Sequence, residues 1–439
     1  MYINRTNENV LGRSFVTPFV TAILGSRRTG KSTLVEHFAT ETPENKWIFF
    51  NMDNIDERQR VAAGQLTPMI EEVAEQIIGR QPKLWICIDE AQKCPELFEQ
   101  IKIIYDKYKD KNVVKFILTG SGFLSLHKLS AESLAGRIQL YYLREFNLFE
   151  TCELTQKVKL PRLSVLEALC EQNNIRIAKN CFNELRPFRP KLEKALADQL
   201  IIGGLPEVLM LDNIKDQRIY FRDYLQTYLE KDVRAVADIM DLKIYQNLIQ
   251  IVAEQTGSLR DDQRIIQALG CSRNTLKKYR GYLTATLLYE DIYPCIDSSL
   301  KRLVKSPKTY LINNGLISYL TGIDSLSILK TTGNIGHRLE NWFLKELHVW
   351  LDRSSRKADI FFWRTAGGRE VDFVVNMPPQ VFPFEVTYSK QVQRHKVNSL
   401  VNFLKAEPKA KMGFYIYTGE DFYFNDKLNI CFMPAWIIG

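Results

Sequence analysis

The sequence predicts an α/β protein with a parallel sheet in its N-terminal third, a helical middle and a smaller α/β region at its end. Apolar runs that alternate with helical patterns carry this prediction, because such alternation is typical of a parallel sheet covered by helices. The length of 439 residues exceeds one ordinary domain, and 45% hydrophobic residues can fill several cores. The predicted strands lie within Phe19 to Leu24, Lys83 to Gln92 and Val113 to Gly122.

Composition narrows the class of protein. The 59 basic and 51 acidic residues give a net charge of +8, which is compatible with a polyanionic partner. The eight cysteines form no C-x-x-C pair and the five histidines are isolated, which predicts a reduced cytoplasmic protein without a zinc site. No window approaches the roughly 18 apolar residues of a membrane span. The apolar stretch 15–25 is interrupted by Thr17 and Pro18 and is interpreted as a strand rather than a signal peptide.

A glycine-rich motif follows the first strand. Residues 25–32, "GSRRTGKS", fit G-x-x-x-x-G-K-[ST], and the residues after them continue as a helix. The glycines let backbone N–H groups wrap a phosphate, Lys31 can reach the β- and γ-phosphates, and Ser32 can offer its hydroxyl to Mg²⁺. The motif predicts binding of ATP with Mg²⁺. The residues predicted to contact the nucleotide are Gly25, Ser26, Arg27, Arg28, Thr29, Gly30, Lys31, Ser32 and Thr33.

Two acids end the second strand. Asp89, at the tip of the apolar run "LWICID", is placed to join Ser32 in the Mg²⁺ shell. Glu90 follows directly and is placed to polarise an attacking water as a general base. A kinase would align a substrate hydroxyl instead, so the acid pair favours hydrolysis. The predicted catalytic residues are Glu90, Lys31 and Arg137.

The third strand ends in small polar residues, and Thr119 or Ser121 is predicted to sense the γ-phosphate. Arg137 precedes a further strand, at the position expected for an arginine finger that acts in its own subunit or in a neighbour. A surface arginine without a catalytic role is the alternative for this position. Ligands of a parallel sheet bind at the carboxyl ends of its strands, so the loop after Leu24 and the acids after Ile88 are expected at one edge.

The order of these motifs resembles that of prokaryotic AAA-type ATPases with a large C-terminal region of poorly defined role. The resemblance rests on the phosphate loop, "CIDEAQ", "ILTGSG", "SLAGR", "YYLREFNLFE", "GGLPEV", "YLEKDVRAVADI" and "SPKTYLINNGLISYLTG". It covers nearly the whole chain, but Leu154–Pro190 does not align, and Asn313-Asn314-Gly315 lacks the family's acidic residue. It implies an AAA-type P-loop core at 1–150 and a helical lid and linker at 151–239. The oligomeric state stays open, a homo-oligomer included.

The region 240–325 is predicted to be winged-helix-like. A helix that Ser272 caps presents an apolar stripe on one side and a basic face on the other, and strands at Leu288–Ile292 and Thr309–Ile312 would supply a wing. The stripe comprises Leu276, Tyr279 and Leu283, and the basic face comprises Arg273, Asn274, Lys277, Lys278 and Arg280. Basic faces of this kind contact DNA phosphates, but many winged helices bind protein, so both partners stay open.

The region 326–439 resembles restriction-endonuclease-like folds. Glu340 lies on a predicted helix, Asp372 on the second strand of a hairpin and Glu385 on the next strand, a pattern that gathers Mg²⁺ for phosphodiester cleavage. The family pattern on the third strand is Glu-x-Lys, but Thr387 occupies the lysine position. Lys390 lies three residues further on, and this odd offset points to the wrong face of a strand. The prediction is a nuclease-like fold that does not cleave, and metal binding by the three acids stays open.

Three functions remain open at this point. The first is a Mg²⁺-dependent ATPase whose cycle acts as a switch on DNA or a protein partner. The second is a nucleotide-gated binding module with negligible turnover, and the third is an ATP-regulated DNA nuclease. Glu90 favours the first over the second, because a pure switch needs no water-activating carboxylate. Thr387 weighs against the third.

Overall fold

The computed structural model describes residues 2–79, 83–121, 133–229, 241–295 and 305–439. The chain divides into two compact units, one built mainly from Met1–Glu145 and the other from Phe146–Leu229, Asp238–Thr284 and Leu288–Gly439. We call them the N-terminal unit and the C-terminal unit. The first ends close to the boundary predicted at residue 150. The second joins three regions that the sequence analysis treated as separate domains.

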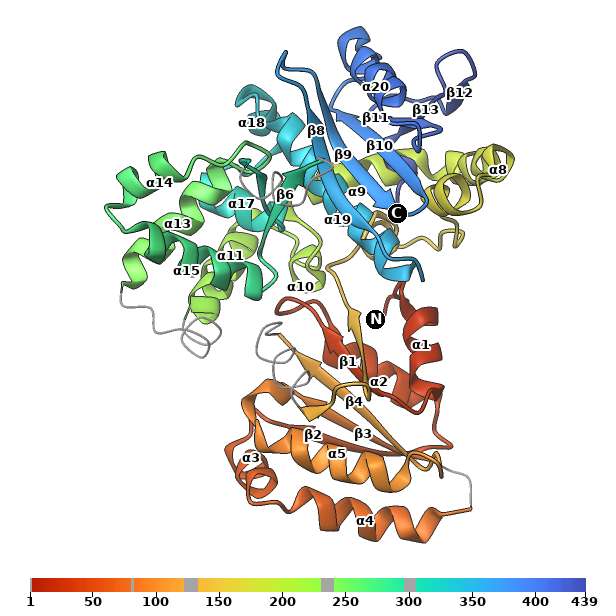
Figure 1. Ribbon diagram of the computed structural model, residues 1–439, viewed down its shortest axis with the longest axis vertical. Coiled ribbons are helices and arrows are strands. Elements are labelled where there is room, and N and C mark those ends of the chain that lie inside the picture. The colour runs from red at the N-terminus through yellow and green to blue at the C-terminus, as the bar shows by residue number, and fades with distance from the viewer. Residues whose placement is uncertain (1, 80–82, 122–132, 230–240, 296–304) are drawn as a thin grey trace. The chain divides into compact units, whose positions relative to one another are not determined.

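The N-terminal unit contains a five-stranded parallel sheet in the order β2-β3-β4-β1-β5 (Figure 1). Its strands are β1 (Val20–Leu24), β2 (Lys46–Asn51), β3 (Leu84–Asp89), β4 (Val114–Gly120) and β5 (Ile138–Tyr142). Its longer helices are α1 (Glu8–Val16), α2 (Lys31–Glu41), α3 (Ile55–Ala62), α4 (Leu66–Ile77) and α5 (Glu96–Tyr108). The α/β class predicted from the alternation of strands and helices is confirmed.

Burial explains why three of these strands could be predicted from the sequence. Side chains from α4 and α5 pack on one face of the sheet, and side chains from α1 and α2 pack on the other. Strands β1, β3 and β4 lie inside this sandwich, and almost all of their side chains are buried. A strand that is buried on both faces carries an unbroken apolar run rather than an alternating pattern.

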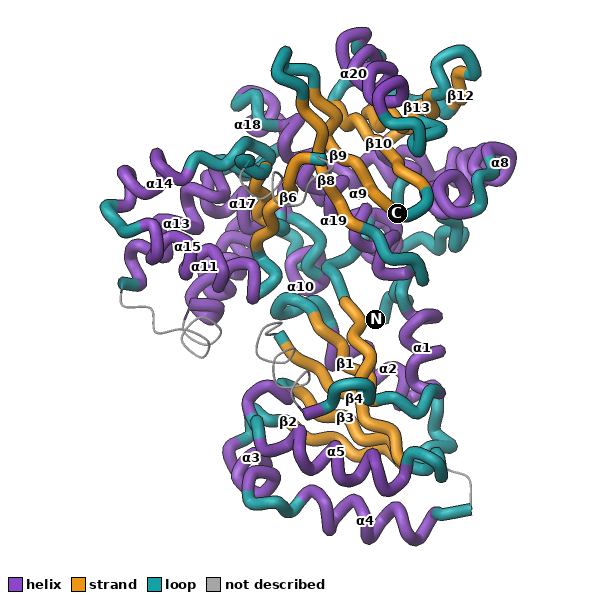
Figure 2. Tube along the Cα trace, viewed as in Figure 1, coloured by secondary structure: helices purple, strands orange, loops and turns teal. Residues whose placement is uncertain are grey.

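The C-terminal unit begins with a run of helices, drawn in purple in Figure 2. They are α7 (Leu148–Gln156), a π-helix (Glu167–Glu171), α8 (Ile175–Leu185), α9 (Arg189–Ile202), α10 (Pro206–Leu209) and α11 (Ile214–Thr227). The helical character predicted for 151–239 is therefore observed as far as residue 229, and residues 230–239 lie outside the described part of the chain. Among the described helices, none is both long and apolar enough to cross a membrane.

Three helices and a strand pair follow. They are α13 (Leu242–Glu254), α14 (Asp262–Leu269), α15 (Arg273–Ala285), β6 (Tyr289–Pro294) and β7 (Lys308–Leu311). The two strands pair antiparallel, and the predicted stripe of Leu276, Tyr279 and Leu283 is buried. The remaining helices are α17 (Asn314–Thr321), α18 (Leu326–Thr331), α19 (Ile335–Arg353) and α20 (Arg394–Ala406).

One sheet crosses the domain boundary that was predicted at 325/326. Strand β6 pairs parallel with β8, through Tyr293 with Phe361, and so joins the wing-like pair to the C-terminal strands. The eight-stranded sheet has the order β12-β13-β11-β10-β9-β8-β6-β7. Its further strands are β8 (Asp359–Arg364), β9 (Glu370–Met377), β10 (Gln380–Thr387), β11 (Gly413–Tyr417), β12 (Tyr423–Asn425) and β13 (Ile430–Pro434). Pairing satisfies backbone groups that an edge strand would leave open, which favours this continuation of the sheet.

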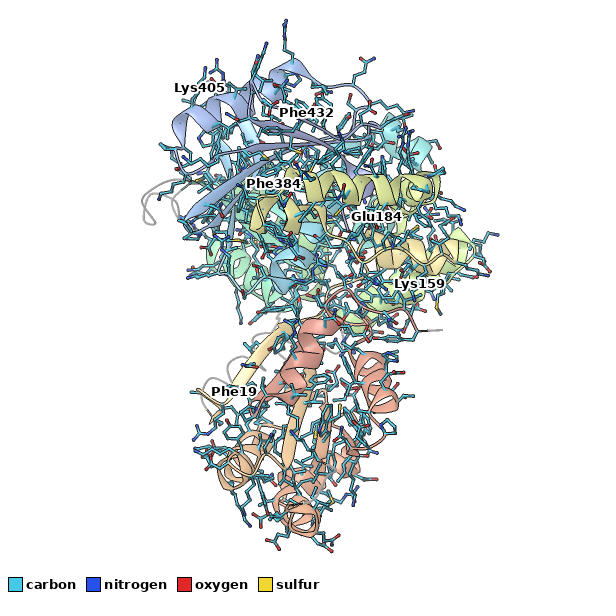
Figure 3. The ribbon with its side chains drawn as sticks, turned by 90° about the vertical axis from the view of Figure 1, so that its right-hand side faces the viewer. Phe19, Lys159, Glu184, Phe384, Lys405 and Phe432 are labelled. Carbon is cyan, nitrogen blue, oxygen red and sulfur yellow. The ribbon has the colours of Figure 1, made fainter. Side chains whose placement is uncertain are left out.

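The core of the C-terminal unit lies on both faces of this sheet. On one face, Phe384 of β10 belongs to a cluster with Trp342 and Phe343 of α19. On the other, Phe432 of β13 belongs to a cluster with Phe403 of α20. Figure 3 labels Phe384 and Phe432 within the layered part of this unit. The sheet is thus a middle layer between α19 and α20.

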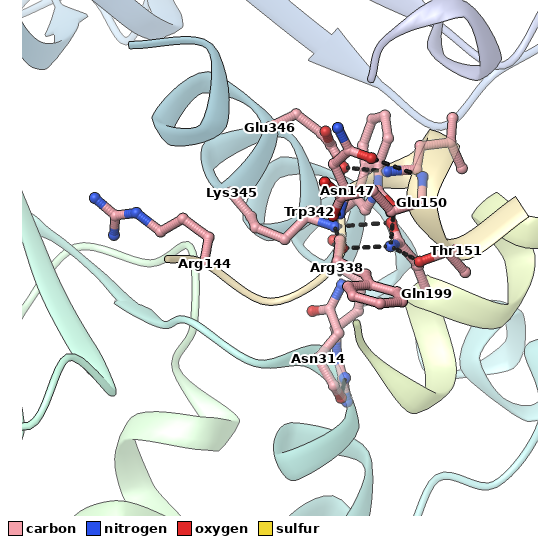
Figure 4. A network of polar contacts seen from close by, with 12 residues as sticks. Arg144, Asn147, Glu150, Thr151, Gln199, Asn314, Arg338, Trp342, Lys345 and Glu346 are labelled. Atoms are coloured by element: carbon pink, nitrogen blue, oxygen red, sulfur yellow. Dashed lines mark hydrogen bonds and ion pairs between the residues drawn. The ribbon is translucent and has the colours of Figure 1, made fainter. Parts of the chain in front are cut away.

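A buried polar network fastens the start of the C-terminal unit (Figure 4). The backbone oxygen of Phe146 accepts hydrogen bonds from Gln199 Nε2 (2.8 Å) and Lys345 Nζ (2.9 Å). Glu346 Oε1 accepts from the N–H of Leu148 (3.0 Å) and lies 2.9 Å from Lys345 Nζ. Burial raises the pKa of Glu346 to about 7, although Lys345 acts to lower it. Two helices distant in sequence, α9 and α19, therefore hold the chain where this unit begins.

Candidate nucleotide-binding site

The predicted phosphate loop joins β1 to α2. Residues 25–30 form the loop, and Lys31, Ser32 and Thr33 form the first turn of the helix, with Ser32 and Thr33 exposed. A side chain at Gly25 would put its Cβ 2.3 Å from the backbone oxygen of Leu143, so only glycine fits there. Gly30 has φ +90, which also favours glycine. With glycine at both positions, the loop backbone can adopt the tight turn that closes around an anion.

Lys31 is folded onto its own loop. Its Nζ donates to the backbone oxygens of Gly25 (3.0 Å) and Ser26 (2.9 Å), and the residue is buried. Thr29 Oγ1 also donates to the oxygen of Ser26 (3.0 Å). The ammonium is thus held against the backbone of the loop.

Arg5 supports the loop from outside the motif. Its guanidinium donates to the backbone oxygen of Thr29 (2.9 Å) and to that of Arg144 (2.6 Å), so it ties the loop to the end of β5. The residue is buried. Nothing in the local sequence around Arg5 indicates this role, because its partners lie 24 and 139 positions away.

The structure brings Ser32, Asp89 and Thr119 together. Ser32 Oγ donates to Asp89 Oδ2 (2.8 Å), and the hydroxyl of Thr119 donates to the other carboxylate oxygen. Strand β4 lies between β1 and β3, which places Thr119 between the loop and the acid. Hydroxyl and carboxylate oxygens are ligands that Mg²⁺ prefers, so Ser32 and Asp89 fit the ion that accompanies ATP.

Glu90 adopts an unusual backbone conformation at the tip of β3. Its φ is +52, a region that non-glycine residues rarely occupy and that recurs at functional sites. Its Oε2 accepts hydrogen bonds from Gln92 Nε2 (2.6 Å) and Ser121 Oγ (3.1 Å). Glu90 and Ser121 therefore meet at the carboxyl edge of the sheet. Gln92 was not singled out in the sequence, although it lies in the same "DEAQ" segment.

Arg137 lies at the opposite end of the strands from the loop, a position that disfavours a finger within its own subunit and leaves a neighbouring copy or a surface arginine as the alternatives. Val20 pairs with Ile138 at the start of the two strands, and Leu24 pairs with Tyr142 at their ends. Arg137 precedes the start, whereas the loop follows the end, and each strand residue adds about 3.3 Å. The Arg137 guanidinium instead binds Asp106 of α5 through two hydrogen bonds of 2.9 and 2.8 Å.

We expect Arg137→Ala to keep ATP turnover within about twofold of the parent, since an exposed ion pair of this kind is worth roughly 0 to 1 kcal/mol. Steady-state ATPase rates at several protein concentrations test this, with Asp106→Ala as the matched control for the same ion pair. A collapse of turnover in Arg137→Ala alone, together with a faster than linear rise of parent activity with concentration, would restore the finger as one that acts on a neighbouring copy.

The three acids of the C-terminal region converge around two lysines. Lys308 Nζ of β7 lies 3.6 Å from Glu340 Oε2 and 3.5 Å from Asp372 Oδ1, and it also contacts Glu370. Lys396 Nζ of α20 lies 2.8 Å from Glu385 Oε1 and 3.5 Å from Asp372 Oδ2. A lysine from a helix, Lys396, therefore lies beside Glu385 and Asp372, a neighbour that the sequence pattern did not indicate.

The lysines also change the protonation of this cluster. Burial and the neighbouring Asp372 raise the pKa of Glu385 well above its usual value. Burial acts in the same sense on Asp372, but Lys396 and Lys308 hold the pKa of Asp372 below its usual value. An ammonium thus already occupies the middle of the carboxylates, where a divalent cation would have to bind.

We expect no Mg²⁺-dependent cleavage of duplex or single-stranded DNA by the purified protein, with or without ATP. The reason is that Lys308 forms ion pairs with Glu340 and Asp372, which neutralises their charge. Both acids are also buried, so a phosphodiester could not contact them. A gel assay of labelled DNA with Mg²⁺ or Mn²⁺ measures this. Cleavage that disappears in both Asp372→Ala and Lys396→Ala, but persists in Lys390→Ala, would establish a nuclease with a displaced lysine.

The predicted basic face of α15 is smaller than the sequence indicated. Lys277 and Lys278 are exposed. Arg280 is buried, and its guanidinium donates to Asp262 Oδ1 of α14 at 2.6 Å. Arg280 therefore ties α15 to α14 rather than facing solvent.

Comparison with known families identifies three segments. A family model described as an AAA domain matches residues 17–152. Two domains of unknown function match later segments, DUF8612 at residues 193–327 and DUF4143 at residues 335–438. The AAA match covers most of the N-terminal unit, including its phosphate-loop motif and strands β1 to β5.

Whole-chain relatives carry no described activity. Uncharacterized protein Rv2008c of Mycobacterium tuberculosis and uncharacterized protein Mb2031c of Mycobacterium bovis are each 25% identical over 404 residues, which is 91% of this chain and 77% of theirs. Among solved structures, the Aeropyrum pernix ORC2 protein in ADPNP and ADP complexes has a TM-score of 0.29 at 14% identity, covering 74% of this chain and 94% of its own. The Aeropyrum pernix ORC1 protein in complex with DNA has 0.30 at 12%, covering 75% and 95%.

Proposed function

We propose that this protein binds ATP with Mg²⁺ and hydrolyses it, and that the cycle acts as a switch on DNA or a protein partner. One observation carries the proposal. The hydroxyl that follows the loop lysine, Ser32 Oγ, lies 2.8 Å from the strand-end carboxylate of Asp89, although the two residues are 57 positions apart. A pair of oxygen ligands assembled beside a phosphate loop is the arrangement that P-loop ATPases use to hold Mg²⁺.

The residues around this pair have separate roles in the proposal. Loop N–H groups and the N-terminus of α2 bind the phosphates, and Lys31 turns from Gly25 and Ser26 toward the β- and γ-oxygens. Mg²⁺, held by Ser32 and Asp89, supplies charge neutralisation on those oxygens. Glu90 accepts the proton of the attacking water. Its hydrogen bonds to Gln92 and Ser121 orient the carboxylate for that step.

An ATPase assay tests the proposal directly. Steady-state phosphate release by the full chain, measured with Mg²⁺ and again with EDTA, should show turnover that needs the metal. Repeating it with duplex DNA, with single-stranded DNA and without DNA shows whether nucleic acid stimulates the cycle. Tight ATP binding with no turnover under any of these conditions would replace the ATPase by a nucleotide-gated binding module.

DNA is the partner that the C-terminal unit supports best. Helices α13, α14 and α15 followed by the antiparallel pair β6 and β7 have the element order of a winged helix. Lys277 and Lys278 lie exposed on the third of these helices. Two neighbouring ammonium groups on such a helix can contact phosphates, which is the basis of the proposal.

We expect DNA affinity to fall steeply with salt and the log–log slope to drop by about one for each of Lys277→Ala and Lys278→Ala. Fluorescence anisotropy with a labelled duplex between low and moderate salt measures the slope. Lys215→Ala, which removes an exposed charge from α11, is the matched control and should leave it unchanged. A flat salt dependence, or no binding at low salt, would point to a protein partner instead.

A further inference from the structure

Arg338 of α19 is a buried cation whose hydrogen-bond partners are all neutral. Its Nη1 donates to the backbone oxygen of Asn314 (2.7 Å) and to Ser318 Oγ (3.1 Å), and its Nη2 donates to Thr321 Oγ1 (3.2 Å). Figure 4 labels Arg338 and Asn314. The side chain is 3% exposed. Within the described ranges no carboxylate forms an ion pair with it. An uncompensated buried charge is costly, so a guanidinium in this state calls for an anion.

A second arginine on α19, Arg353, has acidic neighbours, unlike Arg338. Burial lowers the pKa of Arg353, but Glu167, Glu150, Glu346 and Glu171 act to raise it. For Arg338, burial lowers the pKa to about 9, and among the residues that the structure describes no acid acts to raise it. Arg338 therefore lacks the surrounding negative charge that Arg353 has.

Arg338 also lines a cavity of about 280 Å³. The walls come from α13, α17 and the segment that leads into α19, and they carry Thr321, Thr332, Asn334 and His337. Arg338 and Thr321 both belong to this wall, and Nη2 of Arg338 bonds the Thr321 hydroxyl there. One carboxylate, that of Glu254, also lines the cavity and accepts a hydrogen bond from Gln250 (2.7 Å).

The N-terminus of α19 opens at the same cavity. The helix has 19 residues, and its N-cap residue, Asn334, makes no side-chain capping hydrogen bond. Asn334 and His337, which bracket the first turn, both line the cavity. A long helix whose first N–H groups are not capped by a side chain adds positive potential at the point where Arg338 already supplies a charge.

We propose that this cavity binds the oxyanion group of a small molecule, a phosphate or a carboxylate, with Arg338 as its counter-charge and the first turn of α19 as donors. The hydroxyls of Thr321 and Thr332 donate to the backbone oxygens of Ile317 and Leu329, so the guanidinium and the helix N–H groups are the donors offered to the anion. The site lies within the C-terminal unit and uses none of the residues proposed to bind ATP.

The test uses the full chain with Lys31→Ala, so that the phosphate loop does not contribute. Inorganic phosphate and acetate are titrated separately by calorimetry, and thermal unfolding is followed at the same concentrations. We expect saturable binding of one anion per chain and a raised Tm. Binding of phosphate alone identifies a phosphorylated ligand, and binding of acetate alone identifies a carboxylate.

Asn334→Asp is the decisive variant, because it changes one amide to a carboxylate of the same shape at an exposed position and keeps the N-cap. The tethered charge should repel the anion and compensate Arg338, so affinity should fall at least about tenfold, the effect of one charge-assisted contact. Lys330→Met, which removes an exposed charge from α18, is the control and should bind as the parent does. Failure of both anions to bind, or equal binding by Asn334→Asp, would leave Arg338 as a tie between α17 and α19 only.

Discussion

Glu90→Gln is expected to leave ATP binding intact and to lower turnover by about 10² to 10⁴, the usual contribution of a positioned general base. The amide keeps the shape of the side chain and can still meet Gln92 and Ser121, but it cannot accept the proton of the attacking water. Single-turnover hydrolysis of bound ATP measures the chemical step, and an equilibrium titration on the same preparation measures affinity.

Two outcomes would contradict this role. Unchanged turnover would show that Glu90 is not the base. Loss of both ATP binding and turnover would show a structural role. The left-handed backbone of Glu90 at φ +52 is the reason to test for such a role. Glu99→Gln, an exposed carboxylate on α5, is the matched control and should behave as the parent does.

Lys31→Ala is expected to remove most of the affinity for ATP. It deletes the loop's ammonium, the point charge placed against the β- and γ-phosphates, and charge-assisted contacts to phosphate are about twice as strong as neutral ones. Titration with ATP and Mg²⁺, followed by fluorescence of a labelled analogue and by competition with unlabelled ATP, measures the loss.

The control for this variant must separate lost charge from a collapsed loop, because Lys31 also holds the oxygens of Gly25 and Ser26. Lys31→Met keeps part of the stem and removes only the charge, so it should bind as weakly as Lys31→Ala. Lys102→Ala on α5 should bind as the parent does. Affinity near the parent value in both Lys31 variants would overturn the assignment of the phosphate loop.

Contiguous residues were sufficient to predict the parallel sheet of the N-terminal unit and its phosphate-loop motif. The loop from Gly25 to Ser32 is a local feature, since its glycines, lysine and serine lie within eight consecutive residues. The unbroken apolar runs of β1, β3 and β4 identified buried parallel strands, and each pointed to the polar residue at its tip. The apolar stripe of α15 was likewise legible, because Leu276, Tyr279 and Leu283 follow the helical repeat.

Contacts between distant segments were decided by the tertiary structure alone. Arg5 under the loop, Lys308 and Lys396 among the acids, and Arg280 beside Asp262 all meet partners that no periodicity links to them. Arg137 shows the reason most clearly. Its place at the start of β5 was legible in the sequence, but the parallel register with β1 determines that this start lies at the edge away from the loop. Local pattern specifies which face of a strand or helix is buried, whereas strand order and register specify which buried faces and ends meet.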